Sequence, residues 1–228
     1  MNLLVIDAAT EACSVALQVN GKTYSRFEIC PQQHSQRILP MIDEVLKEAE
    51  VKLQALDYLA FGRGPGSFTG VRIATGILQG LALGSGLKVV GISTLAAMAQ
   101  EAATNTESSR IFAAIDARMS EVYFAEYRLV EGVVSLVAEE KVIPPELALA
   151  NTQLDEKAVG VGTGWAAYET INQSHEVEVL ADILYPNALY MLPLAVSQIN
   201  AGNAVDVEDI EPVYLRDKVT WKKLPGRE

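Results

Sequence analysis

Histidine and cysteine are scarce in this 228-residue chain, which has two residues of each. The histidines, His34 and His175, are far apart, and neither belongs to a pair with the spacing of metal ligands. We therefore expect no metal site and no catalytic residue. Cys13 and Cys30 lie in strand-like runs and are expected to be buried free thiols rather than a disulfide.

Positive charge is also in short supply, since 18 Lys and Arg against 29 Asp and Glu give a net charge of −11. Contacts with phosphate groups need clustered Lys and Arg. If this chain acts on RNA, a partner protein must therefore supply the positively charged surface. No run approaches the roughly 18 apolar residues of a membrane span, and the N-terminus does not resemble a signal peptide. We expect a cytoplasmic protein without membrane contacts.

What the chain does have is apolar patterning, because half of its residues are hydrophobic. Periodicity and turn signals predict strands and helices in alternation. The first strands are expected at residues 3–6, 13–19, 22–29, 58–61 and 88–92, and the first helices over 35–49, 69–84 and 94–103, the last with Ser93 as N-cap. The polar segment Thr104–Ser109 predicts a boundary between an N-terminal lobe, 1–104, and a C-terminal lobe, 105–228.

The second lobe begins like the first. Phe112–Asp116 mirrors Leu3–Asp7, and after each aspartate come a strand-like run, a turn pair and another strand. This pattern predicts duplicated lobes, although any two α/β halves can look alike. We expect a helix near 187–201, which can pack back on the N-terminal lobe.

Residues 62–72, Gly-Arg-Gly-Pro-Gly-Ser-Phe-Thr-Gly-Val-Arg, form a glycine-rich turn between a strand and a helix N-terminus. Backbone N–H groups there suit an anion, and the same residues suit a plain tight turn. The turn has no lysine and lacks the Gly-x-Gly-x-x-Gly spacing, which excludes a P-loop and a dinucleotide motif. Possible anion or nucleotide contacts are Asp7, Thr10, Gly64, Gly66 and Ser67.

The helix over 69–84 has two apolar faces, whereas an amphipathic helix of a soluble protein needs one. The second face, spaced with glycine, predicts close approach of another helix, from a second subunit or from residues 35–49 of the same lobe. The expected partner interface comprises Ile73, Gly76, Ile77, Gly80, Leu83 and Gly84, with Ile38 and Ile42 of the neighbouring helix. We expect the protein alone to form a homodimer through it.

Several motifs together resemble the TsaB (YeaZ) family, which bacteria need for threonylcarbamoyladenosine in tRNA. They are Ile6–Leu17, His34–Pro40, Gly62–Arg72 and Tyr214–Arg216. The first three are specific and cover the N-terminal lobe, and the second lobe matches mainly by architecture. The resemblance implies an α/β, two-lobed fold of the actin, Hsp70 and sugar-kinase (RNase H-like) type, with duplicated mixed-sheet lobes.

The resemblance also implies a division of labour. The catalytic paralogue, TsaD (Gcp), carries two metal-binding histidines, and Thr94 and Met98 occupy the matching positions here. Neither side chain can replace an imidazole on a transition metal. The implied role is a non-catalytic subunit that acts with TsaD and the ATPase TsaE on the adenosine beside the anticodon, in tRNAs reading codons that begin with A. The implied tRNA contact is indirect, and nucleotide binds at most weakly or at the partner interface.

Two alternatives remain open at this point. An independent enzyme of the same superfamily, either a phosphotransferase or a glycoprotease-like hydrolase, is disfavoured by the missing histidines and the lysine-free turn. A nucleotide-sensing interaction module is compatible with the subunit role. In a phosphotransferase Asp7 would hold magnesium-bound water, whereas otherwise its carboxylate accepts backbone N–H bonds at the hairpin.

Overall fold

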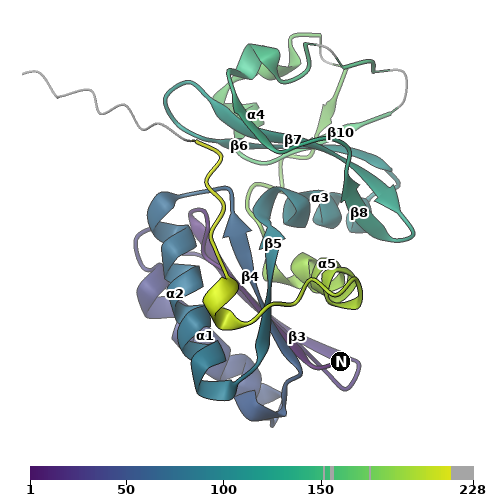
Figure 1. Cartoon of the computed structure of the whole chain (residues 1–228). Coiled ribbons are helices and arrows are strands. Elements are labelled where there is room, and N and C mark those ends of the chain that lie inside the picture. The colour runs from purple at the N-terminus through teal and green to yellow at the C-terminus, as the bar shows by residue number, and fades with distance from the viewer. Residues whose placement is uncertain (151, 155–156, 175, 217–228) are drawn as a thin grey trace, which may run out of the picture.

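Two mixed β-sheets form the frame of the computed structural model, which describes residues 1–150, 152–154, 157–174 and 176–216 (Figure 1). The strands of the first sheet are β1 (Leu3–Asp7), β2 (Ala12–Val19), β3 (Lys22–Ile29), β4 (Tyr58–Gly64) and β5 (Lys88–Ser93). Those of the second are β6 (Arg110–Asp116), β7 (Val122–Val130), β8 (Val133–Leu136), β9 (Lys141–Ile143), β10 (Val159–Val161) and β11 (Glu178–Val179).

The two sheets share one topology. The first has the order β3-β2-β1-β4-β5, and the second β8-β7-β6-β10-β11 with β9 added beside β7. In each sheet the first three strands form an antiparallel meander. β4 and β5 in the first sheet, and β10 and β11 in the second, run parallel to the first strand of their sheet. This repetition confirms the duplicated lobes that the sequence predicts.

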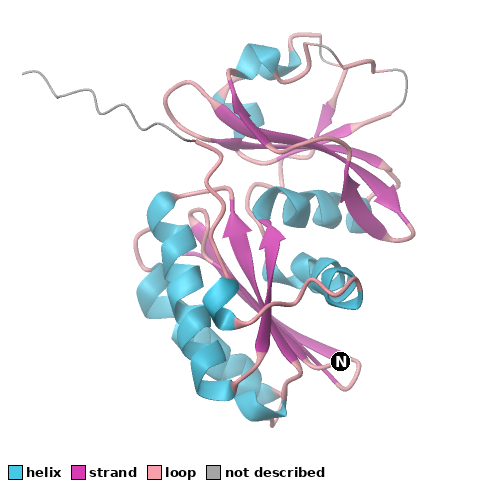
Figure 2. Cartoon of the chain, in the orientation of Figure 1, coloured by secondary structure: helices cyan, strands magenta, loops and turns pink. Residues whose placement is uncertain are grey.

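Helices separate and cover the sheets in layers (Figure 2). They are α1 (His34–Glu48), α2 (Phe68–Ser85), α3 (Thr94–Asn105), α4 (Gly164–Ala167) and α5 (Ala188–Asn200), with short 3-10 turns at Leu53–Ala55, Pro145–Leu147, Glu169–Asn172 and Val207–Asp209 (η1 to η4). α1 and α2 pack with one face of the first sheet. α3 and α5 pack in a core shared by both sheets, which makes them the middle layer.

The predicted strands and helices of the first lobe are all present. Ser93 caps α3 as expected, because its hydroxyl accepts the Ala96 N–H at 3.2 Å. The sequence did not predict β9 and β11, which have three and two residues and are too short to show an alternating pattern. Among the described helices, none is both long enough and apolar enough to cross a membrane.

The C-terminal part of the chain returns to the first lobe. α5 packs against β1, β2 and β5, and a bridge pairs Val205 with Val89 on the edge strand β5. Val213 then donates its N–H to the Arg63 carbonyl at 2.8 Å. α5 therefore packs back on the first sheet, as the sequence analysis allowed for the helix near 187–201, and residues 202–213 follow it. The reason is that α5 is apolar around most of its circumference and needs burial on more than one side.

Candidate functional site

Asp7 ends β1 and lies completely inside the first lobe. One carboxylate oxygen accepts the Ala9 N–H at 3.2 Å, and the other has no partner in the described part of the chain. Burial raises the pKa of Asp7 to about 7, against the lowering effect of the Ala9 bond. Gly62 covers the carboxyl group, since a Cβ atom there would come within 1.8 Å of it. Asp7 is therefore shielded from solvent in the single chain, and its contact with a nucleotide stays a prediction.

The glycine turn packs directly on the β1–β2 turn. A Cβ atom on Gly66 would lie 2.2 Å from the Ala9 carbonyl oxygen, and one on Gly70 would lie 2.0 Å from that of Ala8. The Ser67 N–H donates to the Ala9 carbonyl at 2.7 Å. Only glycine permits backbones to approach this closely. The sequence left open whether residues 62–72 bind an anion or form a plain tight turn, and the structure shows a tight turn packed on its neighbour.

The other predicted anion contacts do not form one exposed site. Gly64 is buried with a φ of 99°, and a Cβ atom there would lie 2.9 Å from the Val213 carbonyl oxygen. Thr10 is also buried, and its hydroxyl accepts a backbone N–H two residues further on at 3.5 Å. Ser67 is exposed as the N-cap of α2. Gly64 thus packs against the Val213 carbonyl in the single chain, and its contact with an anion stays a prediction.

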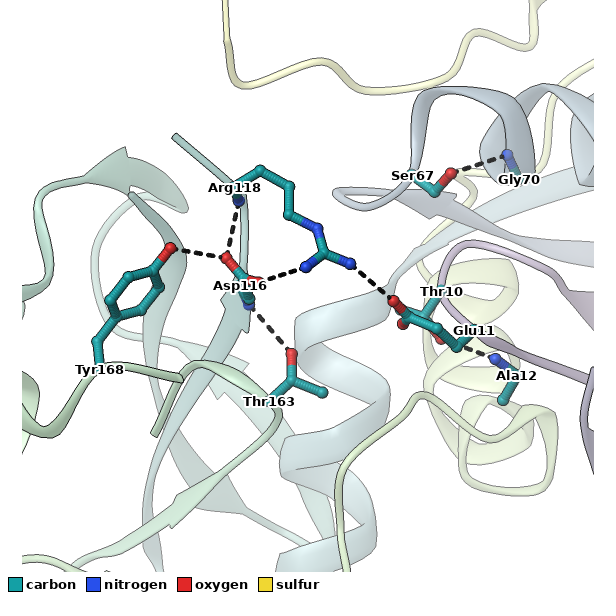
Figure 3. Close-up of polar contacts among 9 residues, drawn as sticks. All are labelled: Thr10, Glu11, Ala12, Ser67, Gly70, Asp116, Arg118, Thr163 and Tyr168. Atoms are coloured by element: carbon teal, nitrogen blue, oxygen red, sulfur yellow. Dashed lines mark hydrogen bonds and ion pairs between the residues drawn. The ribbon is translucent and has the colours of Figure 1, made fainter. Parts of the chain in front are cut away.

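A polar cluster that the sequence analysis missed joins the two lobes (Figure 3). Asp116, which ends β6 as Asp7 ends β1, accepts the Arg118 N–H at 2.8 Å and the Tyr168 hydroxyl at 2.9 Å. The Arg118 guanidinium pairs with Asp116 at 3.1 Å and with Glu11 of the first lobe at 3.2 Å. The repeat that makes Asp116 the counterpart of Asp7 is the sequence signal that points to this cluster.

The hydrogen bonds and ion pairs of this cluster have a structural role, because they connect the two lobes. The Asp116 N–H also donates to the Thr163 hydroxyl at 3.1 Å, which fixes the end of β6. Desolvation, followed by the hydrogen bond to Asp116, raises the pKa of the Tyr168 hydroxyl and keeps it protonated. Each charge that the cluster contains faces an opposite charge or a donor. The arrangement holds two lobes together and presents no activated nucleophile.

A second polar bridge lies deeper between the lobes. The Tyr127 hydroxyl on β7 donates to the Glu140 carboxylate at 2.8 Å and lies 3.3 Å from the Ser93 hydroxyl of the first lobe. The Arg63 guanidinium on β4 lies 3.5 Å from the same carboxylate. Burial raises the pKa of Tyr127 well above its ordinary value, so the phenol remains a donor. The first and second lobes therefore share a buried hydrogen-bond network.

Thr94 and Met98 lie on the first turns of α3, inside the core. The Thr94 hydroxyl donates to the Pro65 carbonyl at 2.5 Å, and Met98 is fully buried between the sheets. Across the described ranges, no group of three or more His, Cys, Asp or Glu residues could hold a metal ion. His34 is buried at the first residue of α1, and His175 lies outside the described residues. A hydrogen bond explains the position of the Thr94 side chain, and packing in the core explains that of Met98.

The two cysteines are free and buried, as expected. The Cys13 and Cys30 sulfur atoms lie 2.8 Å apart within the core beneath α1. Burial, and then the hydrogen bond to Cys30, raise the pKa of the Cys13 thiol. Because the thiolate is the reactive form, this environment disfavours nucleophilic chemistry at Cys13.

The outer face of α2 is uncovered in the single chain. Gly76, Gly80 and Gly84 are exposed, and no atom lies within 4 Å of a Cβ atom built on any of them. Leu83 beside them is 69% exposed, and Ile73 and Ile77 are half-buried. The inner face meets the first sheet through Val71, Ala74, Leu78 and Ala82. One of the two apolar faces that the sequence predicts is therefore free.

Ile38 and Ile42 do not belong to this surface, and the prediction was wrong for both. They are 0% and 4% exposed, in the core between α1 and the first sheet. The apolar stripe of an amphipathic helix packs first on its own lobe, and α1 has only this one stripe. The half-exposed Leu39 is the apolar side chain that α1 leaves near solvent.

Comparisons with known proteins gave full-length matches. The family model described as TsaD, tRNA N6-adenosine threonylcarbamoyltransferase, matches residues 27–224. The tRNA threonylcarbamoyladenosine biosynthesis protein TsaB of Escherichia coli (strain K12) is 50% identical, with 100% of both chains covered. The protein of the same name from Haemophilus influenzae is 48% identical and covers 100% of this chain and 99% of its own. The solved structure of YeaZ from Pseudomonas aeruginosa is 45% identical, with a TM-score of 0.89 over 94% of this chain and 99% of that one.

Proposed function

We propose, from the premise that the chain belongs to the TsaB family, that it is a non-catalytic subunit acting with TsaD and TsaE in tRNA threonylcarbamoylation. The modified residue is the adenosine beside the anticodon in tRNAs that read codons beginning with A. The observation that carries the proposal is 50% identity, along the whole chain, to a protein named for tRNA threonylcarbamoyladenosine biosynthesis.

The environment of the candidate catalytic groups supports a partner role. Thr94 and Met98 are held inside the core, and Asp7 is sealed between strands. The cluster around Asp116 is occupied by its own ion pairs. We infer that the chain brings no metal or cofactor of its own to the reaction, and that nucleotide binds weakly or at the interface with a partner. Elemental analysis of the purified chain checks the metal part of this inference.

The surface that suits TsaD is the outer face of α2. Its exposed glycines let a second helix approach closely, and Leu83 supplies an apolar side chain to bury. The corrected interface comprises Ile73, Gly76, Ile77, Gly80, Leu83 and Gly84. We propose that the chain alone forms a homodimer through this face and that TsaD takes the place of the second copy.

The net charge of −11 supports indirect contact with tRNA in the cytoplasm. A phosphate backbone is repelled by an acidic surface unless lysine and arginine cluster locally. In this proposal TsaD carries the substrate-binding surface, and the present chain positions or stabilises TsaD.

Reconstitution tests the proposal. Purified TsaD, TsaE, tRNA and threonylcarbamoyl-adenylate should yield modified tRNA only when this chain is added, and the chain alone should yield none. Titration of TsaD into the homodimer should produce a complex with one copy of each chain. ATP hydrolysis or peptide cleavage by the chain alone would contradict the non-catalytic role. A TsaD complex that keeps the homodimer contact would contradict shared use of α2.

A further inference from the structure

Residues 211–216, here called the strap, run from the first lobe towards the second (Figure 1). Near the start of the strap, the Val213 N–H bonds to the carbonyl of Arg63 on β4 at 2.8 Å. The Tyr214 ring centre lies 4.7 Å from the guanidinium carbon of Arg72, in the first turns of α2. The strap is thus fastened to the end of β4 and to the exposed N-terminal end of α2.

The other end of the strap contacts an unusual turn in the second lobe. Arg118, Met119 and Ser120 have φ values of 62°, 58° and 59°, so three successive residues other than glycine are left-handed. This conformation is disfavoured because each Cβ atom approaches a backbone carbonyl. The Arg216 guanidinium donates to the Arg118 carbonyl at 3.3 Å and pairs with the Glu121 carboxylate at 2.5 Å. Contacts from outside the turn therefore support it.

Arg118 connects this turn to the first lobe. Its carbonyl accepts the bond from the strap, and its guanidinium pairs with Glu11 and Asp116. These three residues, Glu11, Arg118 and Asp116, are here called the latch. The Arg118 side chain is 74% exposed, and such exposed ion pairs are weak by themselves. The direction of Arg118 therefore depends on the backbone of the turn, which Arg216 holds.

We propose that the strap couples the exposed end of α2 to the latch between the lobes. While the strap is in place, Arg216 holds the turn and Arg118 bridges to Glu11. When Tyr214 separates from Phe68 and Arg72 at the end of α2, Arg216 leaves the turn and the bridge opens. The coupling belongs to the isolated chain, so it is independent of the proposed function and of which partner uses α2.

Hydrogen exchange on the full-length chain tests the coupling with one variant at each end of the strap. Tyr214→Ala releases the end at α2, and Arg216→Gln releases the end at the turn. The reporters are the amides of Arg118 and Glu121, which donate to the Asp116 carboxylate and the Arg118 carbonyl. We expect both amides to exchange about tenfold faster in both variants.

Two controls accompany the measurement. Arg37→Gln breaks a comparable ion pair with Glu28 in the first lobe and should leave the reporter amides unchanged. The amides of α3, which lies in the shared core, should keep their protection in every variant and so report global unfolding. If Arg216→Gln also accelerates exchange in α3, Arg216→Lys replaces it, because lysine keeps the charge but lacks the guanidinium fork.

Faster exchange at the turn in Tyr214→Ala supports the proposal, because the Tyr214 ring contacts Phe68 and Arg72 of α2. Faster exchange in the Arg216 variant alone overturns it and reduces Arg216 to a local contact. Unchanged exchange at Arg118 and Glu121 in both variants also overturns it.

Discussion

At the scale of single residues, the two strand-ending aspartates have opposite environments although the repeat makes them counterparts. Asp7 is sealed with one oxygen unpaired, whereas Asp116 is partly exposed and paired with Arg118 and Tyr168. Different neighbours make this difference, since Gly62 of β4 covers one carboxyl group and Arg118, two residues after Asp116, neutralises the other. The consequence for Asp7 is a free-energy cost that depends on pH.

Asp7→Asn should remove a pH dependence of stability. Because burial raises the folded-state pKa of Asp7 from 3.8 to about 7, the folded chain keeps this proton longer than the unfolded chain. Its contribution to stability is therefore fully present below pH 4 and is lost as the pH rises towards 7, by about 4 kcal/mol in all. Urea unfolding at pH 5 and pH 8 should show a smaller loss with rising pH in the variant.

Asp43→Asn is the matched control for the loss of a carboxyl group, because Asp43 is exposed on α1 beside Lys47. Burial also raises the pKa of Glu101 to about 7, so a slope of the same sign should remain in Asp7→Asn. An identical slope in Asp7→Asn and the unaltered chain would contradict the assignment to Asp7.

At the scale of elements, α2 and the turn before it use glycine in two different ways. Gly66 and Gly70 are required because backbone carbonyls lie where their side chains would be. Gly76, Gly80 and Gly84 have open space around them and cost helix stability without any gain inside the single chain. The first use belongs to folding, and the second is explained by an approaching partner.

Alanine at one position of each kind should change stability in opposite directions. Gly66→Ala should lower the free energy of unfolding by about 2–3 kcal/mol, because its Cβ atom meets the Ala9 carbonyl. Gly76→Ala should raise it by about 1 kcal/mol, since alanine is the better helix former and the site is open. Chemical denaturation of both variants measures the difference. At protein concentrations low enough for the chain to be monomeric, destabilisation by Gly76→Ala would mean that the outer face of α2 packs within the monomer.

Gly80→Leu should weaken both the homodimer and TsaD binding while the melting temperature stays near normal. The structure accommodates the side chain in the single chain, as nothing lies within 4 Å of a Cβ atom there. Sedimentation for the dimer and titration calorimetry with TsaD measure the two associations. Ser197→Leu, on an exposed position of α5, is the control and should bind normally. If Gly80→Leu associates as strongly as the unaltered chain, the interface does not lie on this face of α2.

At the scale of the whole molecule, the lobes are joined by more than their shared apolar core. The outer latch from Arg118 to Glu11 is exposed, while the inner network from Arg63 through Glu140 to Tyr127 is largely buried. Removing one member of a buried network costs more stability than removing one member of an exposed pair. The remaining buried groups have lost their contacts with water and no longer have a hydrogen-bond partner in exchange. The inner network should therefore contribute more to the stability of the two-lobed unit.

Tyr127→Phe should lower the free energy of unfolding by about 1–3 kcal/mol, since the Glu140 carboxylate loses a donor at 2.8 Å in a buried place. Tyr190→Phe, which removes an exposed hydrogen bond from Asn105, should change it by less than about 0.5 kcal/mol. Urea denaturation of the two variants gives the comparison. Equal effects would show that the inner network adds little to the contact between lobes.

Local sequence signals were sufficient to predict the elements of the first lobe and their repetition. Apolar alternation, the Asn20-Gly21 turn and the Ser93 cap are local signals, so they indicated β1 to β5, α1 to α3 and the duplicated lobes without reference to distant residues. The motif resemblance indicated the family that the full-length matches confirm. The two apolar faces of α2 were also visible, because helical periodicity is a property of one segment.

Which of these surfaces are exposed depends on contacts between distant segments. Burial of Ile38 and Ile42 depends on the sheet beneath α1, and the roles of Gly62 and Gly66 depend on carbonyl and carboxyl groups more than 50 positions away in the chain. The return of residues 202–213 to the first lobe and the bridge from Arg118 to Glu11 are likewise contacts between distant segments. Such contacts follow from packing, which leaves no periodic trace in a single sequence.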